Sequence, residues 1–288
     1  MGKKKKQSKS SRKTKQQSTR KTATKLSTER PNSAANFSDD QIESFLKTGE
    51  HQGLLEAYFG EELYREFQEL SRNTRSASRR GGQRVLILPG ILGSKLGTKG
   101  RIFDDTIWLD PVDAMLGNLL KLKMSSNSKI TSLGVMLHAY LPAKLRLWYA
   151  GFDAEFHHYD WRQSIDKLGR DLANKIIKET GGSNTSRPGS ISIVAHSMGG
   201  LVSRRALQIL SEKTESDGET PMLDRVNRLV MQGTPNFGSF APAMVVQGVY
   251  PTIKKVAALD LYHTVEELSE KLFSGPVSYT HLTLPTKA

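Results

Sequence analysis

The chain has 288 residues, enough for one large α/β domain or two small ones. It contains no cysteine, which excludes disulfide bonds, thiolate catalysis and cysteine-ligated metals. The net charge of +13 is concentrated in residues 1–30, where twelve Lys or Arg face the single acid Glu29, so the rest of the chain carries only +2. The high overall charge therefore says nothing about the substrate of the folded part.

Residues 1–36 form a basic tail with almost no apolar side chains. Such a segment cannot bury enough surface to offset chain entropy, and we expect it to be disordered. Three roles are open: a solvated leader without a partner, weak electrostatic contact with an anionic membrane, and contact with the phosphates of a nucleic acid. The tail has no aromatic side chain for base stacking, so any nucleic-acid contact would be non-specific.

No apolar run approaches the roughly 18 residues of a membrane-spanning helix. The basic start is also not followed by the apolar core of a signal peptide. We therefore expect a cytoplasmic or peripheral membrane protein.

Residues 37–74 are predicted to form a helical prelude. Ser38 followed by two aspartates is typical of a helix cap, and the apolar residues between Leu54 and Leu70 recur at helical spacing. The prelude could pack on the domain, serve as a partner helix or tie down the tail, and packing is the simplest interpretation. Residues 75–82, rich in Ser, Arg and Gly, are predicted to be a linker.

From Gln83 onward, predicted strands and helices alternate. Strands are predicted at 85–88, 152–159, 191–194 and 228–231, and helices at 165–176 and from about 198 to 213. This alternation predicts a mostly parallel sheet with helices on both faces. Sites in such sheets lie at the carboxyl ends of the strands.

The segment Ala195-His196-Ser197-Met198-Gly199 joins a predicted strand to a predicted helix. It has the pattern of a nucleophile elbow, in which small residues two before and two after the serine permit a tight turn. Ser197 is therefore the candidate nucleophile. The backbone N–H of Met198, at the helix start, is a candidate oxyanion donor. A buried serine in an ordinary strand-to-helix turn is the alternative.

The apolar run 85–88 suits a strand buried on both faces, and it ends at the turn Pro89–Ser94. Because glycine tolerates backbone angles that other residues avoid, Gly90 and Gly93 could let the Ile91 amide reach a substrate oxygen. Ile91 is thus the second candidate oxyanion donor. An ordinary strand-ending turn is the alternative.

Together these segments resemble the lecithin:cholesterol acyltransferase family of α/β hydrolases. The resemblance spans about residues 84–240, in the family's order, and rests on Leu88–Leu96, Ile107–Pro111, Tyr159–Arg162, Ala195–Gly200 and Gly233–Ser239. It implies an α/β-hydrolase domain over 83–277 and acyl-ester chemistry on lipid-like substrates, with an acyl-enzyme on Ser197 and transfer to an alcohol or water. We expect neither metal nor cofactor. A lid is implied at about 241–273, with ordinary hydrophobic core as the alternative.

The resemblance also implies a triad Asp and then a triad His after the nucleophile. The candidates that follow it are Asp217, Asp224, Asp260, His263 and His281. The first two acids precede the next strand and come too early. Asp260 and His263 are three residues apart in a predicted helix and would share one face of it. We therefore expect the triad acid and base to be absent from this chain.

Residues 278–288 resemble a peptide that recurs at the ends of unrelated assembled sequences, as if a sequencing adapter had been translated. A genuine short strand is the alternative. On the first interpretation the domain is truncated after about Val277, His281 is not a native base and the 288-residue chain is close to inactive. A truncated sheet would also expose an unpaired strand edge.

Three further histidines lie next to the motifs in the sequence, His196 beside Ser197 and His157 with His158 just before Tyr159. His196 precedes the serine in a strand, where successive side chains point to opposite faces, so it is not predicted to be the base. His157 and His158, with Asp160, lack metal-ligand spacing, and we expect packing or surface roles for them.

Two functional hypotheses follow. The first is a serine-dependent acyl hydrolase or O-acyltransferase of lipid metabolism. The second is a catalytically silent α/β-hydrolase-like scaffold whose basic tail and helical prelude dock on a membrane or partner.

Overall fold

The computed structural model of the protein describes residue 34 and residues 37–73, 82–100, 104–108, 110–125, 128–181, 190–214 and 221–272. Most of the basic tail and of the predicted linker, Asp217, and residues 273–288 with His281 lie outside the described residues. None of the described helices is long and apolar enough to span a membrane.

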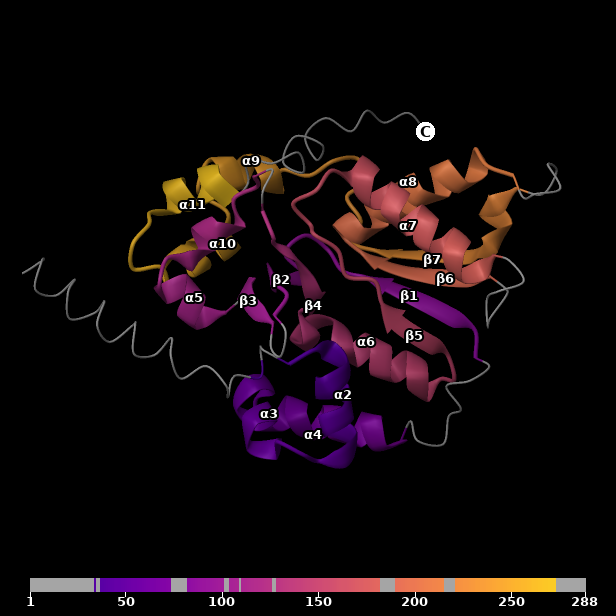
Figure 1. Ribbon diagram of the computed structural model, residues 1–288, viewed down its shortest axis with the longest axis horizontal. Coiled ribbons are helices and arrows are strands. Elements are labelled where there is room, and N and C mark those ends of the chain that lie inside the picture. Colours follow the sequence, from indigo (N-terminus) through magenta and orange to yellow (C-terminus); the bar gives the residue numbers. More distant parts are fainter. Residues whose placement is uncertain are drawn as a thin grey trace, which may run out of the picture.

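The centre of the fold is a four-stranded parallel sheet in the order β5-β1-β6-β7 (Figure 1). Its strands are β1 (Arg84–Leu88), β5 (Asp153–Phe156), β6 (Ile191–His196) and β7 (Val226–Gln232). Helices α7 (Ile165–Thr180) and α8 (Met198–Ser211) lie along one side of the sheet and α6 (Leu137–Tyr149) along the other. The predicted α/β class, a parallel sheet flanked by helices, is confirmed.

The packing of strand β1 explains why its residues from Val85 to Leu88 are all apolar. Leu86 and Leu88 belong to the hydrophobic cluster that contains α7 and α8 residues. Val85 and Ile87 belong to a second cluster, with residues of α6 and of the helical prelude. Because successive side chains in a strand point to opposite faces, a strand covered on both sides needs an unbroken apolar run.

The helical prelude consists of α2 (Asp39–Thr48), α3 (Gln52–Phe59) and α4 (Glu61–Asn73), which lie below α6 in Figure 1. The predicted cap is present: the Gln41 N–H donates to Ser38 Oγ at 3.2 Å, and the Ser38 N–H donates to Gln41 Oε1 at 2.9 Å. The second helical run is interrupted at Gly60, whose φ of 84° favours glycine.

Two buried ion pairs join α2 to the rest of the protein. Lys95 Nζ lies 2.8 Å from Asp39 Oδ1, and Asp39 Oδ2 accepts the Val135 N–H at 2.7 Å. Lys144 Nζ, from α6, lies 2.6 Å from Glu43 Oε1. Burial raises the pKa of the Glu43 carboxyl, and Lys144 opposes that shift. Charged contacts therefore specify how the prelude docks on the domain.

We expect Lys144→Ala to lower the free energy of unfolding by about 3–5 kcal/mol, because it leaves the Glu43 carboxylate buried without its partner. The double variant Glu43→Leu with Lys144→Met removes both charges and should cost much less. Urea unfolding of the wild type and both variants measures the difference. A single variant no less stable than the double variant would contradict the assignment.

A small antiparallel sheet, which the sequence did not predict, lies beside the main one. It contains β3 (Asp105–Trp108), β2 (Ser94–Thr98) and β4 (Thr131–Val135) in the order β3-β2-β4. The short α5 (Pro111–Met115) and the 3₁₀ helix η3 (Asn118–Leu122) follow β3. A second 3₁₀ helix, η4 (Met222–Arg225), precedes β7.

The segment predicted to be a lid forms three short helices, α9 (Ala241–Val246), α10 (Pro251–Ala257) and α11 (Val265–Leu272). They gather near α5 in Figure 1, and α11 packs on η3. Ile253, Val256, Leu268 and Leu272 are buried in the same hydrophobic cluster as α7 and α8 residues. Part of this segment therefore contributes to the core, while its role as a lid stays a prediction.

Candidate active site

Ser197 occupies a strained turn between β6 and α8. Its backbone has φ 51° and ψ −121°, a conformation that is rare for a residue other than glycine. The Ser197 N–H donates to the Gln232 carbonyl at the end of β7 (2.9 Å), and the Ser197 carbonyl accepts the Gly200 N–H (3.0 Å). The neighbouring strand and the first turn of α8 thus hold the serine at the carboxyl edge of the sheet.

The small residues of the motif are required by close backbone contacts. A Cβ atom on Gly199 would lie 2.6 Å from the Pro89 carbonyl oxygen, and one on Gly200 would collide with the Thr234 side chain. Ala195 is fully buried in the sheet. The elbow therefore touches the turn after β1 on one side and the loop after β7 on the other.

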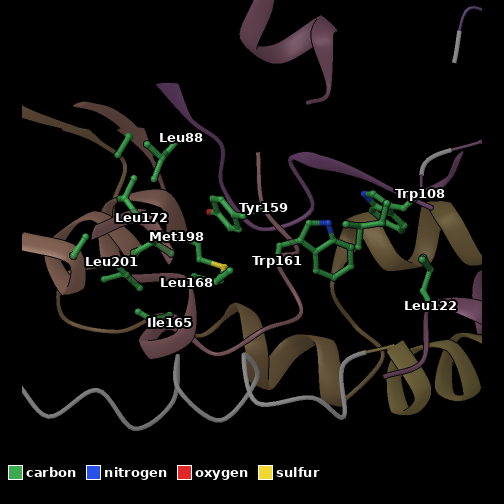
Figure 2. Close-up of a cluster of buried hydrophobic side chains, with 14 of the residues drawn as sticks. Leu88, Trp108, Leu122, Tyr159, Trp161, Ile165, Leu168, Leu172, Met198 and Leu201 are labelled. Atoms are coloured by element: carbon green, nitrogen blue, oxygen red, sulfur yellow. The ribbon is translucent and has the colours of Figure 1, made fainter. Parts of the chain in front are cut away.

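Four aromatic side chains hold the turn Pro89–Ser94, which carries the Ile91 amide. Their bonds are Tyr159 Oη–H to Pro89 O (2.5 Å), Gly90 N–H to Tyr140 Oη (2.9 Å), Trp108 Nε1–H to Leu92 O (3.0 Å) and Trp161 Nε1–H to Ser94 O (3.2 Å). Figure 2 shows Tyr159, Trp161 and Trp108 in the buried cluster that also contains Met198. The turn is therefore fixed by side chains from three separate segments: β3, α6 and residues 159–161.

The turn and the elbow are in direct contact. A Cβ atom placed on Gly90 would lie 2.9 Å from Ser197 Cβ and 3.0 Å from His196 Nδ1. Ile91 follows Gly90 directly, and Met198 begins α8, where the first N–H groups of a helix have no intrahelical acceptor. The structure thus brings the segments of all three predicted site residues together. The roles of Ile91 and Met198 as oxyanion donors stay predictions.

The Tyr-Asp-Trp-Arg segment supports the site rather than lining it with reactive groups. Arg162 donates to both carboxylate oxygens of Asp160 at 2.7–2.8 Å and to the Leu122 carbonyl at 2.5 Å. Trp161 is fully buried and packs edge-on against Trp108. This segment is one of those that resemble the lecithin:cholesterol acyltransferase family. In the structure, its hydrogen bonds to Leu122 on one side and to Pro89 and Ser94 on the other connect η3 to the turn after β1.

The predicted helix over Asp260 and His263 is wrong. Both residues lie in the loop between α10 and α11, where Asp260 Oδ1 accepts the N–H groups of Tyr262 (2.7 Å) and His263 (3.0 Å). A carboxylate that accepts nearby backbone N–H groups competes with helix formation. Its other oxygen, Oδ2, lies 3.0 Å from His263 Nδ1.

Asp260 and His263 therefore form a carboxylate–imidazole pair. The Asp260 side chain is fully buried, and the His263 ring packs against Gly117, where a Cβ atom would lie 2.9 Å from its Cε1. Within the described ranges, no hydrogen bond joins this imidazole to Ser197. Asp224 lies in η4 at the amino end of β7, the edge of the sheet opposite the serine, as its early position predicts.

His157 and His158 line a separate cavity of about 330 Å³ at the carboxyl end of β5, together with Asp160 and Lys167. Burial lowers the pKa of His157 to about 4, so its imidazole is neutral at physiological pH. His158 Nδ1 is bonded to Ser132 Oγ at 2.8 Å. Across the described part of the chain, no cluster of three or more His, Cys, Asp or Glu side chains could hold a metal ion.

Comparisons with known proteins support the coarse class of the site. The profile of a protein family described as "Putative serine esterase (DUF676)" matches residues 154–279, which contain the elbow and β7. The fold and this match together describe an α/β-hydrolase-like protein with a serine-esterase-type region.

Among solved structures, a chain of "The crystal structure of Tle4-Tli4 complex" is similar, with 15% identity and a TM-score of 0.33. The alignment covers 57% of this chain and 48% of that chain, so the protein spans about half the length of that match. A search of curated proteins finds no match.

Proposed function

We propose that the protein catalyses serine-dependent acyl-ester chemistry on lipid-like substrates, as a lipase or esterase or as an O-acyltransferase, through an acyl-enzyme on Ser197. The observation that carries this proposal is the contact between the strained serine turn and the turn after β1, at Gly90. The serine-esterase profile over residues 154–279 and the resemblance to lecithin:cholesterol acyltransferases both support it.

In this mechanism the Ser197 oxygen attacks the ester carbonyl carbon while its proton passes to a general base. The negative charge that develops on the carbonyl oxygen is stabilised by the N–H groups of Ile91 and Met198. Collapse of the tetrahedral intermediate releases the alcohol and leaves the acyl group on Ser197. Attack by water then completes a hydrolysis, and attack by another alcohol completes an acyl transfer.

The surface near the carboxyl end of β7 supports a lipid-like substrate. Phe237 and Phe240, in the segment that follows β7, are 89% and 87% exposed. The sequence from Leu229 to Ile253 contains no charged residue, although 25% of the whole chain is charged. An uncharged segment with exposed aromatic side chains suits the approach of an apolar acyl chain.

Labelling with a fluorophosphonate tests the proposal, because this reagent phosphonylates activated serines. We expect the full-length protein to carry one adduct, on the peptide that contains Ser197. Ser211→Ala, an exposed serine at the end of the same helix, is the matched control and should label like the wild type. An adduct on a different serine, or a folded protein that does not react, would contradict the proposal.

We further propose that any contact of the basic tail with membranes is electrostatic and separable from catalysis. Deleting residues 1–36 should remove binding to anionic vesicles while leaving hydrolysis of a soluble short-chain ester unchanged, because the charge is concentrated in the tail. Moderate salt should have the same effect as the deletion. Vesicle co-sedimentation that survives both treatments would assign membrane binding to another surface.

A further inference from the structure

The Tyr140 hydroxyl lies between the two halves of the candidate site. It accepts the Gly90 N–H at 2.9 Å, and it lies 3.0 Å from His196 Nδ1. Tyr140 comes from α6, and its side chain is buried. A Cβ atom on Gly93 would approach the hydroxyl to 2.6 Å, so the turn after β1 encloses it. One hydroxyl therefore contacts both the turn after β1, which carries the candidate oxyanion donor Ile91 and is called the oxyanion turn below, and His196, the residue before the nucleophile.

The number of protons available decides which atom donates in each of the two hydrogen bonds of Tyr140 Oη, to Gly90 N and to His196 Nδ1. A tyrosine hydroxyl has one proton and two lone pairs, and the Gly90 N–H can only donate, so it occupies a lone pair. The remaining proton of a buried hydroxyl needs an acceptor, and His196 Nδ1 is at hydrogen-bond distance. Burial raises the pKa of Tyr140, so the hydroxyl keeps its proton at physiological pH. His196 Nδ1 is therefore the acceptor.

An imidazole that accepts at Nδ1 is neutral and carries its proton on Nε2. His196 ends β6 immediately before Ser197, and its side chain is exposed at the carboxyl edge of the sheet. The Nε2–H lies on the side of the ring away from Tyr140. The exposed histidine thus offers one uncharged hydrogen-bond donor next to the nucleophile.

We propose that Tyr140 is a positioning residue that holds the oxyanion turn and fixes His196 as the neutral Nε2–H tautomer, which donates a hydrogen bond to an oxygen of the bound ester. The inference rests on the proposed function for its substrate, but not for its geometry. It gives His196 a role in binding that differs from general base catalysis. It also explains why α6, remote in sequence, packs against the turn after β1.

Nuclear magnetic resonance of the protein with ¹⁵N-labelled histidine tests the tautomer without an activity assay. We expect the His196 signals, assigned from the His196→Gln variant, to show protonated Nε2 and unprotonated Nδ1 at mildly alkaline pH. Tyr140→Phe should relax the tautomer ratio towards that of a free neutral imidazole, in which Nε2–H is only modestly favoured. Tyr149→Phe, an exposed tyrosine at the end of the same helix, should retain it.

Kinetics of ester hydrolysis test the donor role. His196→Leu should raise KM about tenfold, the equivalent of one hydrogen bond of about 1.4 kcal/mol, with little change in kcat. His196→Gln keeps an N–H donor and should restore most of the loss. Tyr140→Phe should mainly lower kcat, because it frees the oxyanion turn.

The outcomes separate the two proposals. A wild-type His196 that is protonated on Nδ1, or a tautomer ratio that is the same in Tyr140→Phe as in the wild type, would overturn the inference whatever the activity. If Tyr140→Phe does not fold, the wild-type spectrum still decides. Failure of the fluorophosphonate to label Ser197 would overturn the proposed function and leave the tautomer result standing.

Discussion

Replacing Ser197 with alanine is expected to abolish fluorophosphonate labelling and to remove nearly all ester hydrolysis. Loss of the nucleophile in a complete serine site costs about 10⁶-fold in kcat, and what remains, from oxyanion stabilisation and binding, is about 10³ to 10⁴ over water. Steady-state hydrolysis of a short-chain ester by the full-length protein measures the loss. Circular dichroism should show that the variant keeps its fold, because the substitution removes one oxygen at a half-exposed position.

The control for this variant is Ser211→Ala, which changes an exposed serine in the same helix and should leave the rate within about twofold of wild type. Hydrolysis that persists at the wild-type rate in Ser197→Ala would place the reaction elsewhere in the protein.

The second large effect is expected from Gly199→Val. A Cβ atom at this position would lie 2.6 Å from Pro89 O and 2.9 Å from Leu88 O, both backbone atoms that cannot rotate away. We expect the turn after β1 to move, with a loss of stability of about 1–3 kcal/mol from overpacking. A displacement of about 1 Å in a catalytic group can cost about 100-fold in rate, so labelling of Ser197 should slow by at least that factor.

Thermal unfolding and the rate of fluorophosphonate labelling measure these two consequences of Gly199→Val. Gly53→Ala is the matched control, since it lies in α3 and a Cβ atom there would meet nothing within 4 Å. That variant should be as stable as the wild type or slightly more stable. A Gly199→Val protein that labels at the wild-type rate would show that the contact between elbow and turn is unimportant.

The parts of the fold that could be predicted are those with local signals. The apolar runs of β1 and β6 are covered on both faces, and the elbow depends on small residues within five positions of one another. The small sheet gave no such signal. Strand β2, for example, reads Ser-Lys-Leu-Gly-Thr and buries Lys95 against Asp39, so it lacks the alternation of a half-buried strand.

In the candidate site, too, the residues with a local sequence signal could be predicted and those without one could not. The sequence predicts Ser197, Ile91 and Met198 as site residues because the small residues that permit their tight turns lie within a few positions of them. Tyr140 was missed because it is 50 residues from Gly90 in the sequence and no motif surrounds it. The spacing of Asp260 and His263 predicts a helix, but the Asp260 carboxylate accepts the backbone N–H groups that a helix would have used, so the segment forms a loop.

The central claim, that Ser197 and the amides of Ile91 and Met198 form one oxyanion site, is tested most directly by the crystal structure of the fluorophosphonate adduct. The account predicts a covalent bond from phosphorus to Ser197 Oγ, with the phosphoryl oxygen about 2.7–3.1 Å from both backbone nitrogens. An adduct on Ser197 whose phosphoryl oxygen points to solvent, or to other donors, would contradict it.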